Sequence, residues 1–293
     1  MTTAPIPPPR QRGRRPDVTR TGRVRRRRIR IALALAIVAA LVGAAIGIRS
    51  LLKTPKPPVV AGCEVTIGQA TYSLDLAQAS NATTIAAVGK RLGLPDHAVT
   101  VALATALQES GLHNLGYGDL DSLGLFQQRP SQGWGTPAEI LTPHYAAAAF
   151  FEHLAAVPGW ETLPVTVAAQ QVQRSSSPDA YAQWESEART LAEGLTGEVP
   201  TGLSCQFPGL PPGATASLSD AMSLELGPPT VGVAVLAARG WTVSAWLVGH
   251  ATQFGITSVA FDGRAWTAAG GAWGPDPVAG SEVIVTRVHT GST

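Results

Sequence analysis

One carboxylate stands out as a candidate for acid–base chemistry. Glu109 follows an uncharged, largely apolar segment, residues 98–107, and Ser110 and Gly111 come directly after it. Glycine accepts left-handed backbone angles without a Cβ clash, so Gly111 is suited to end a helix there. A charge at the end of a buried helix must face a cavity or a partner. A carboxyl group partly removed from water can stay protonated, so Glu109 is the candidate general acid.

A glycine-punctuated turn rich in polar side chains follows Glu109 in the sequence. It begins with two acids and a serine and continues as a Gly-Leu-Phe-Gln-Gln run, comprising Asp119, Asp121, Ser122, Gly124, Leu125, Phe126, Gln127 and Gln128. Amide side chains suit a sugar ligand, because its hydroxyl and N-acetyl groups form neutral hydrogen bonds with them. One acid beside an amide-rich turn therefore predicts cleavage of a glycosidic bond.

Asp119 and Asp121 are candidate second carboxylates. A retaining glycosidase needs a second carboxylate about 5 Å from the acid, and an inverting enzyme needs room for a water between them. The alternative is a role in forming the turn, because an Asp beside Gly118 and before Ser122 can hydrogen-bond the local backbone. Both interpretations are open from the sequence.

The sequence around Glu109 resembles a known family. The strings ALATALQESGL (102–112) and DSLGLFQQ (121–128) resemble the Glu-Ser and Gly-Leu-(Met or Phe)-Gln motifs of the soluble lytic transglycosylase and goose-type lysozyme-like superfamily. Residues 118–135 also resemble a subgroup of cell-wall proteins of high-GC bacteria. The resemblance covers residues 80–195 and implies a mainly α, lysozyme-like domain with Glu109 as general acid/base. The substrate-binding residues that it implies are Ser110, Ser122, Gly124, Leu125, Phe126, Gln127, Gln128, Tyr145 and Gln170.

The third motif of that family is altered. Its Ala-Tyr-Asn-Ala-Gly has its best counterpart in residues 169–173, AQQVQ, which lack the tyrosine that orients the acid. Tyr145 and Tyr181 are the candidates to replace it. Trp134, between two glycines, is either a platform on which a sugar ring stacks or a core residue. The histidines lack HExxH or paired spacing, so the sequence predicts no metal site and no cofactor.

Basic residues are concentrated at the N-terminus. Eleven of the 22 Lys and Arg lie between Arg10 and Arg30, which leaves 11 basic and 19 acidic residues in the remainder of the chain. An arginine run can indicate nucleic-acid binding. Here it precedes an unbroken run of 18 apolar or glycine residues, 31–48, which reaches the lower length limit for a transmembrane helix. We therefore expect a membrane partner and no nucleic acid.

The positive-inside rule places the arginine-rich end in the cytoplasm and the rest of the chain outside. The sequence thus predicts a single-pass protein of the cytoplasmic membrane with an uncleaved signal anchor. A cleavable signal peptide is the alternative, because Ala44 and Ala45 offer small residues. Residues 60–63, Val-Ala-Gly-Cys, resemble a lipoprotein cleavage box, but Lys53 separates them from the apolar run.

The two cysteines, Cys63 and Cys205, bracket the region that carries the motifs. Export makes a disulfide between them chemically permissible. Such a bond would restrict the unfolded chain by about 4–5 kcal/mol in the chain-entropy model. Two unrelated buried thiols are the alternative.

Composition divides the chain into six segments. They are a disordered basic tail (1–30), a transmembrane signal anchor (31–48), a Pro-rich linker (49–62), a lysozyme-like catalytic domain (63–205), a second linker (206–216) and a small α+β module (217–293). Helical patterns cover 75–92, 95–110, 143–156, 165–173 and 178–195. In the last segment a helix at 243–254 precedes a hairpin with an Asp262-Gly263 turn and a strand at 282–288. This module resembles those at the ends of some bacterial cell-wall hydrolases and is expected to be non-catalytic.

Two functions follow as expectations. The first is a membrane-anchored, extracytoplasmic glycosidase that cleaves peptidoglycan glycan strands, either as a lytic transglycosylase or as a muramidase. The second is a non-catalytic scaffold that binds glycan within a cell-wall synthesis or division complex, and the altered third motif motivates it.

Overall fold

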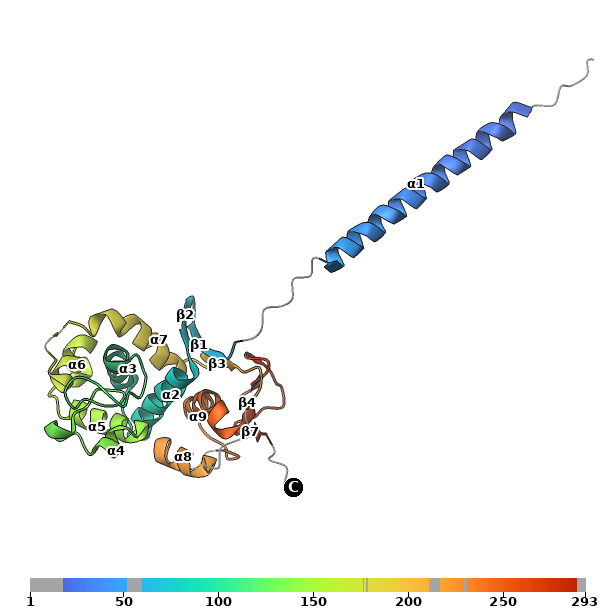
Figure 1. Ribbon diagram of the computed structural model, residues 1–293. Coiled ribbons are helices and arrows are strands. Elements are labelled where there is room, and N and C mark those ends of the chain that lie inside the picture. Colours follow the sequence, from blue (N-terminus) through green and yellow to red (C-terminus); the bar gives the residue numbers. More distant parts are fainter. Residues whose placement is uncertain are drawn as a thin grey trace, which may run out of the picture. The chain divides into compact units, whose positions relative to one another are not determined.

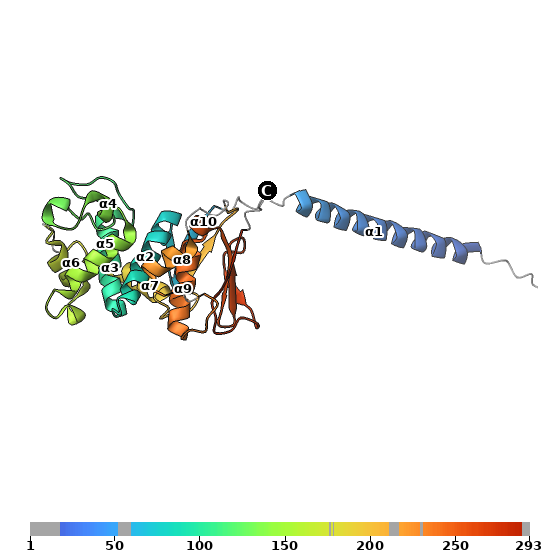
Figure 2. The same cartoon turned by 90° about the horizontal axis from the view of Figure 1, so that it is seen from below.

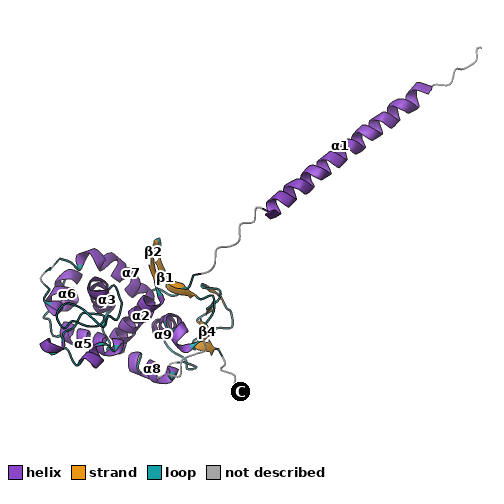
Figure 3. Ribbon diagram, viewed as in Figure 1, coloured by secondary structure: helices purple, strands orange, loops and turns teal. Residues whose placement is uncertain are grey.

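The computed structural model describes residues 18–51, 60–175, 177, 179–210, 217–228 and 231–288. They belong to two units, Met1–Pro58 and Val59–Thr293. The described residues of the first unit form one helix, and the second unit combines helices with two antiparallel sheets, so its fold is α+β (Figure 3). The strands gather at one side of the second unit, away from α5 (Pro143–Ala155) and α6 (Val165–Gln173) (Figures 2 and 3).

The first unit is the long helix α1 (Val18–Leu51). Within it, residues Arg25–Ala45 have a mean hydropathy of 2.0 and are not buried against any other described residue; Leu35, for example, is 66% exposed. This helix is long and apolar enough to span a membrane or to be a signal sequence.

The expectation of a disordered tail over 1–30 is wrong for its second half. Helix α1 begins at Val18, so much of the arginine run is helical. Arginine is a good helix former, and a helix that has nucleated in the apolar run extends cooperatively into such residues. Residues 1–17, and most of the Pro-rich linker, lie outside the described residues.

The second unit contains the expected helices. They are α2 (Leu76–Arg91), α3 (Asp96–Ser110), α5, α6 and α7 (Glu185–Leu195). The short helix α4 (Pro137–Ile140) was not predicted. Asp75 and Gln78 form a capping box at the start of α2, and Gly111 ends α3 in the left-handed conformation (φ 60°, ψ 35°) as the sequence predicts. The 178–195 segment begins later than expected, with a 3₁₀ turn at Ala182–Trp184 before α7.

A three-stranded sheet that the sequence analysis did not predict lies at the edge of these helices. It has the order β2-β1-β3, with β1 (Gly62–Ile67), β2 (Ala70–Leu74) and β3 (Leu203–Gln206) all antiparallel. Cys63 and Val65 of β1 are buried, and the residues between and after them are not, which is the alternation of a half-buried strand. The residues that directly follow the predicted linker (49–62) therefore form a β-hairpin.

The predicted Cys63–Cys205 disulfide is confirmed. The two residues are direct partners in the register of β1 and β3, with a Cα–Cα distance of 4.0 Å and a sequence separation of 142. Closing a loop of that length removes conformational entropy from the unfolded chain, worth about 4–5 kcal/mol in the entropic model. The bond thus fastens the two ends of the 63–205 segment across one sheet.

The residues after 217 form helices α8 (Leu218–Glu225), α9 (Ala237–Gly249) and α10 (Ala251–Phe254) and a sheet of order β6-β5-β4-β7. Its strands are β4 (Ile256–Phe261), β5 (Arg264–Thr267), β6 (Trp273–Pro275) and β7 (Ile284–Arg287). Asp262 and Gly263 both have positive φ angles (48° and 74°), which a two-residue type I′ turn requires, so the predicted hairpin is present.

The predicted catalytic domain (63–205) and the predicted C-terminal module (217–293) belong to one compact unit in the structure. Helix α9 packs against α2, as Figure 1 shows, and Trp266 Nε1 donates to the Cys205 carbonyl at 2.9 Å. Trp273 Nε1 donates likewise to the Leu203 carbonyl at 2.9 Å. A small sheet buries too little apolar area to be stable alone. Packing against α2 and β3 supplies the missing core.

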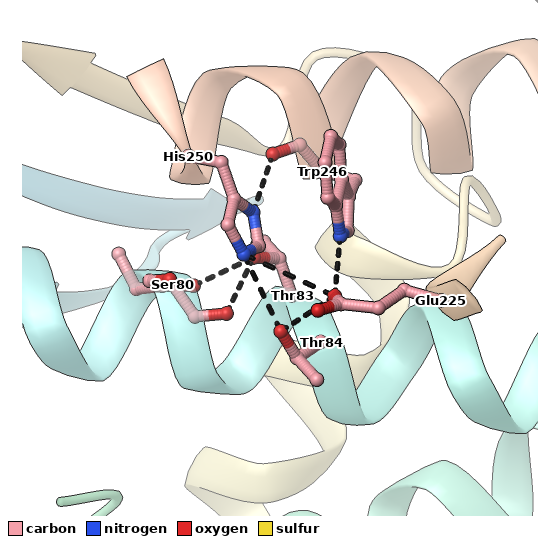
Figure 4. Close-up of polar contacts among 7 residues, drawn as sticks. Ser80, Thr83, Thr84, Glu225, Trp246 and His250 are labelled. Carbon is pink, nitrogen blue, oxygen red and sulfur yellow. Dashed lines mark hydrogen bonds and ion pairs between the residues drawn. The ribbon is translucent and has the colours of Figure 1, made fainter. Parts of the chain in front are cut away.

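A buried polar cluster joins α8, α9 and α2 (Figure 4). Glu225 Oε2 accepts hydrogen bonds from Thr84 Oγ1 (2.7 Å) and Trp246 Nε1 (2.6 Å), and it lies 3.9 Å from His250 Nε2. The His250 side chain is 3% exposed, and its Nδ1 lies 2.9 Å from the Trp246 carbonyl oxygen. Burial lowers the pKa of His250, and the Glu225 charge and the Trp246 hydrogen bond oppose this shift only in part.

We expect this cluster to make stability depend on pH. In the unfolded chain a histidine has a pKa of about 6.5, and in the folded chain the pKa of His250 is lower. The unfolded state therefore binds more protons below about pH 6.5, so acidification destabilises the fold. Thermal unfolding between about pH 7 and pH 5 should show a smaller fall in Tm for His250→Gln than for the unchanged protein. His144→Gln, outside the cluster, should leave the slope as it was. An equally steep fall in His250→Gln would contradict the assignment.

Candidate active site

Helix α3 carries the candidate acid to the edge of the core. The helix is buried from Ala98 to Leu107, and its last turn, which contains Glu109, is half-buried. Glu109 lines a cleft of about 650 Å³. The uncharged segment is thus a core helix, and the acid at its end faces a cavity, as the sequence predicts.

The glycine-punctuated turn docks on the end of α3. Ser110 Oγ donates to the Leu125 carbonyl at 2.7 Å, and the Gly124 amide donates to the Leu115 carbonyl at 2.7 Å. Gly124 has a φ of 76°, and a Cβ there would lie 2.7 Å from the Ile140 carbonyl oxygen. Only glycine fits this position. The turn is therefore fixed beside Glu109 by backbone contacts.

The cleft is lined mainly by polar side chains from three parts of the chain. They are Glu109 of α3; Asp119, Ser122, Gln127, Arg129, Gln132 and Trp134 of the turn and the residues after it; and His153, Ala156, Val157, Gln171, Val172, Gln173, Arg174 and Ser175 from the ends of α5 and α6. Four of the residues predicted from sequence are in this set: Glu109, Asp119, Ser122 and Gln127. The structure brings the acid and the amide-rich turn together.

Three predicted substrate-binding residues lie in the core instead. The Leu125 and Phe126 side chains are fully buried, and Phe126 stacks on Phe150 with ring centroids 4.6 Å apart. Gln128 is also buried; its backbone pairs with Leu123, and its Nε2 donates to the Ala146 carbonyl at 3.0 Å. Their prediction as sugar contacts is corrected. The apolar side chains of Leu125 and Phe126 face the core, and the bond to the Ala146 carbonyl holds Gln128 there.

The other predicted substrate contacts position backbone rather than lining the cleft. Ser110 and Gly124 make the docking contacts described above. Tyr145 packs against Gly135, where an added Cβ would meet its hydroxyl at 2.7 Å. Gln170 Nε2 donates to the Ser175 carbonyl at 2.8 Å. None of these four lines the cleft, and their role in substrate binding stays a prediction.

The two candidate second carboxylates have different surroundings. Asp121 accepts hydrogen bonds from Arg129 Nε (2.7 Å), the Ser131 amide (2.8 Å) and Ser131 Oγ (3.0 Å). The Arg129 hydrogen bond is the largest cause holding the pKa of Asp121 well below its usual range. Asp121 therefore bonds the turn, as the alternative interpretation of this residue expects, and it does not line the cleft. Asp119 lines the cleft and remains a candidate second carboxylate.

A tyrosine from outside the altered third motif contacts the acid. Tyr181, just before the 3₁₀ turn, is fully buried, and its hydroxyl donates to Glu109 Oε1 at 2.7 Å. Burial, and next the Glu109 carboxylate, raise the pKa of Tyr181 well above its ordinary value, so the phenol stays a neutral donor. Of the two tyrosines considered from sequence, Tyr181 holds this position.

The cleft is also lined by Trp134, for which the sequence left a sugar platform and a core position open, and by residues that sequence reasoning missed, among them His153 and Arg174. Trp134 stacks on His153, with ring centroids 3.9 Å apart and planes 25° apart, and both line the cleft. Gln173 Nε2 donates to the Phe126 carbonyl at 2.8 Å, which joins the end of α6 to the turn. No local signal identifies His153 or Arg174, because each reaches the cleft through the packing of α5 and α6 on α3.

No protein-family model matches this chain, and no curated protein matches it in sequence.

We expect the contact between Tyr181 and Glu109 to be visible in an alkaline titration. Tyrosinate absorbance should rise in two stages, with Tyr181 ionising last because its site is buried and faces a carboxylate. Tyr181→Phe should remove the late stage and leave the rest of the curve unchanged. Glu109→Gln should move the late stage to lower pH, because the neutral amide no longer repels a phenolate. A titration curve identical in all three proteins would contradict the contact.

Proposed function

We propose that this protein cleaves glycosidic bonds of peptidoglycan, as a lytic transglycosylase or a muramidase of lysozyme-like fold. The carrying observation is the placement of Glu109, whose carboxylate lines the cleft and has one oxygen bonded to buried Tyr181. General acid catalysis requires a carboxyl group that is fixed in place and can still reach its substrate. The resemblance of the Glu-Ser and Gly-Leu-Phe-Gln motifs supports the same assignment.

In the proposed mechanism, protonated Glu109 donates its proton to the oxygen between muramic acid and glucosamine as the C–O bond breaks. In a transglycosylase the muramic 6-hydroxyl then attacks the anomeric carbon, and the Glu109 carboxylate takes the hydroxyl proton. In a muramidase a water attacks instead, and Asp119 is the candidate to assist it. One acid is sufficient for the first route.

The cleft walls suit a sugar chain. Amide side chains of Gln127, Gln132 and Gln171 offer donors and acceptors to hydroxyl and N-acetyl groups. The stacked pair of Trp134 and His153 offers an aromatic edge to a sugar ring. A cleft of about 650 Å³ holds more than one sugar-sized ligand group.

A non-catalytic glycan-binding scaffold is the second candidate. The altered third motif favours it, because residues 169–173 carry glutamines where the family has a tyrosine and an asparagine. The Tyr181 contact supplies one of the lost interactions from another segment. This observation favours the enzyme over the scaffold.

We place the second unit outside the cytoplasmic membrane, with α1 as an uncleaved anchor. The arginines that precede its apolar part support an N-terminus inside. The disulfide between Cys63 and Cys205 supports an oxidising compartment for the residues that follow.

Protease added to intact spheroplasts tests this topology. The second unit should be degraded, while a tag on the N-terminus should remain intact and attached to a fragment that contains α1. A protected second unit would contradict the topology, and loss of the N-terminal segment from mature protein would favour a cleaved signal.

Glu109→Gln tests the catalytic role. The amide keeps the shape of the side chain but cannot donate the proton, so clearance of purified sacculi should fall by at least about a hundredfold. Glu152→Gln changes an exposed carboxylate of α5 that does not line the cleft and should leave the rate unchanged. Clearance by Glu109→Gln at the unchanged rate would refute the assignment.

A further inference from the structure

Two arginines, Arg129 and Arg174, line the cleft, and they differ in whether an acidic side chain pairs with the guanidinium group. Arg129 Nε bonds to Asp121 Oδ1 at 2.7 Å, so a neighbouring acid already matches its charge. In the part of the chain that the structure describes, Arg174 forms no ion pair with any acid. Its guanidinium is thus a cleft-lining cation without a protein anion.

The backbone under Arg174 is held in an unusual conformation. Arg174 ends α6 with φ 52° and ψ 39°, a left-handed position that glycine or asparagine ordinarily takes. Residues with a Cβ occupy this region only where the surroundings enforce it, and such positions concentrate at functional sites.

Three hydrogen bonds fix that backbone. The Arg174 amide donates to the Gln170 carbonyl at 2.8 Å, and Gln170 Nε2 donates to the Ser175 carbonyl at 2.8 Å. Immediately before it, Gln173 Nε2 donates to the Phe126 carbonyl at 2.8 Å. The segment 173–175 is therefore anchored both to its own helix and to the turn beside Glu109. A side chain on such an anchored segment starts from a defined position, which lowers the entropy lost on binding.

The chemistry of the neighbours selects the class of ligand group. Guanidinium groups bind carboxylates through paired N–H donors. The cleft residues adjacent to Arg174 in sequence, Gln173 and Ser175, add neutral polar groups and no competing acid. We propose that Arg174 binds a carboxylate carried by the glycan substrate and so selects acidic glycan strands over neutral ones. This inference rests on the proposed function.

The carboxylate has two sources in peptidoglycan chemistry. One is the lactyl group of muramic acid, which is free only where no stem peptide is attached. The other is the stem peptide itself. The recognition chemistry is the same, so three length-matched ligands separate the sources: a chitin oligosaccharide without carboxylates, a peptide-free glycan strand with free lactyl groups, and a strand that carries stem peptides.

Binding is measured by calorimetry on the full chain in detergent, in a Glu109→Gln background so that no ligand is cut. The background protein should bind at least one carboxylate-bearing strand about two- to fivefold more tightly than chitin, as for one solvent-accessible charged pair. Adding Arg174→Gly should abolish that preference and leave chitin affinity unchanged. Glycine suits the left-handed position, so the melting temperature of this variant should be equal or higher.

Arg264→Gln, which removes an exposed cation of β5, is the matched control and should keep the preference. Whichever strand loses affinity in Arg174→Gly identifies the source of the carboxylate. Equal affinity for chitin and acidic strands in the background protein would overturn the inference and leave the proposed function standing. The same would follow if Arg174→Gly retained the preference. Failure of all three ligands to bind would overturn the proposed function together with the inference.

Discussion

The site depends on how a helix of the core can end. From Ala98 to Leu107, α3 is buried and carries no charge, and the end of a helix leaves backbone groups that need partners. Gly111 turns the chain into the left-handed conformation, and the following carbonyls find side chains of α2. Gln78 Nε2 donates to the Gly111 carbonyl at 3.0 Å, and Asn81 Nδ2 donates to the Leu112 carbonyl at 2.8 Å. These hydrogen bonds to the carbonyls after the helix end set the direction of the chain beyond Glu109.

From that end the rest of the site follows. Ser110 bonds the returning turn, whose apolar residues fill the core while its polar residues face the cleft. Gln173 donates a hydrogen bond to the Phe126 carbonyl of this turn, which fixes the end of α6 beside it. The Tyr181 hydroxyl donates a hydrogen bond to Glu109. The acid, the amide-rich turn and the anchored arginine thus share one chain of hydrogen bonds and packing contacts. This continuity explains why residues far apart in sequence form one cleft.

Local sequence patterns predicted the main helices and the position of Glu109 at a helix end. They did not predict features that form only when segments distant in sequence pack together. The uncharged run before Glu109 and the glycine after it were sufficient to predict α3 and its cleft-facing end. The β1–β2 hairpin was missed because its strands are short and its third strand lies more than 130 residues away. Leu125 and Phe126 were assigned to the substrate from a motif, although their apolar character indicated the core. From the sequence, either Tyr145 or Tyr181 could replace the missing tyrosine of the third motif. Only the packing of the folded chain shows that Tyr181 is the one that contacts Glu109.

The same limit explains the C-terminal residues. Their helix and hairpin were predicted from sequence, but their dependence on α2 and β3 was not, because the tryptophan donors that join them to the Cys205 and Leu203 carbonyls leave no local pattern. The Glu225–His250 cluster is likewise assembled from three helices. The C-terminal segment therefore acts as part of the core that supports α2, the helix that satisfies the end of α3.

Mass spectrometry of glycan digested by the full-length protein tests the central claim most directly. If Glu109 cleaves the bond next to muramic acid, new chain ends must appear, and their chemistry names the route: anhydromuramic ends for a transglycosylase and reducing ends for a hydrolase. We expect one of these two kinds of end in the digest of the unchanged protein, and no new ends in the Glu109→Gln digest. Glycan that binds the protein and is recovered without new ends would contradict it.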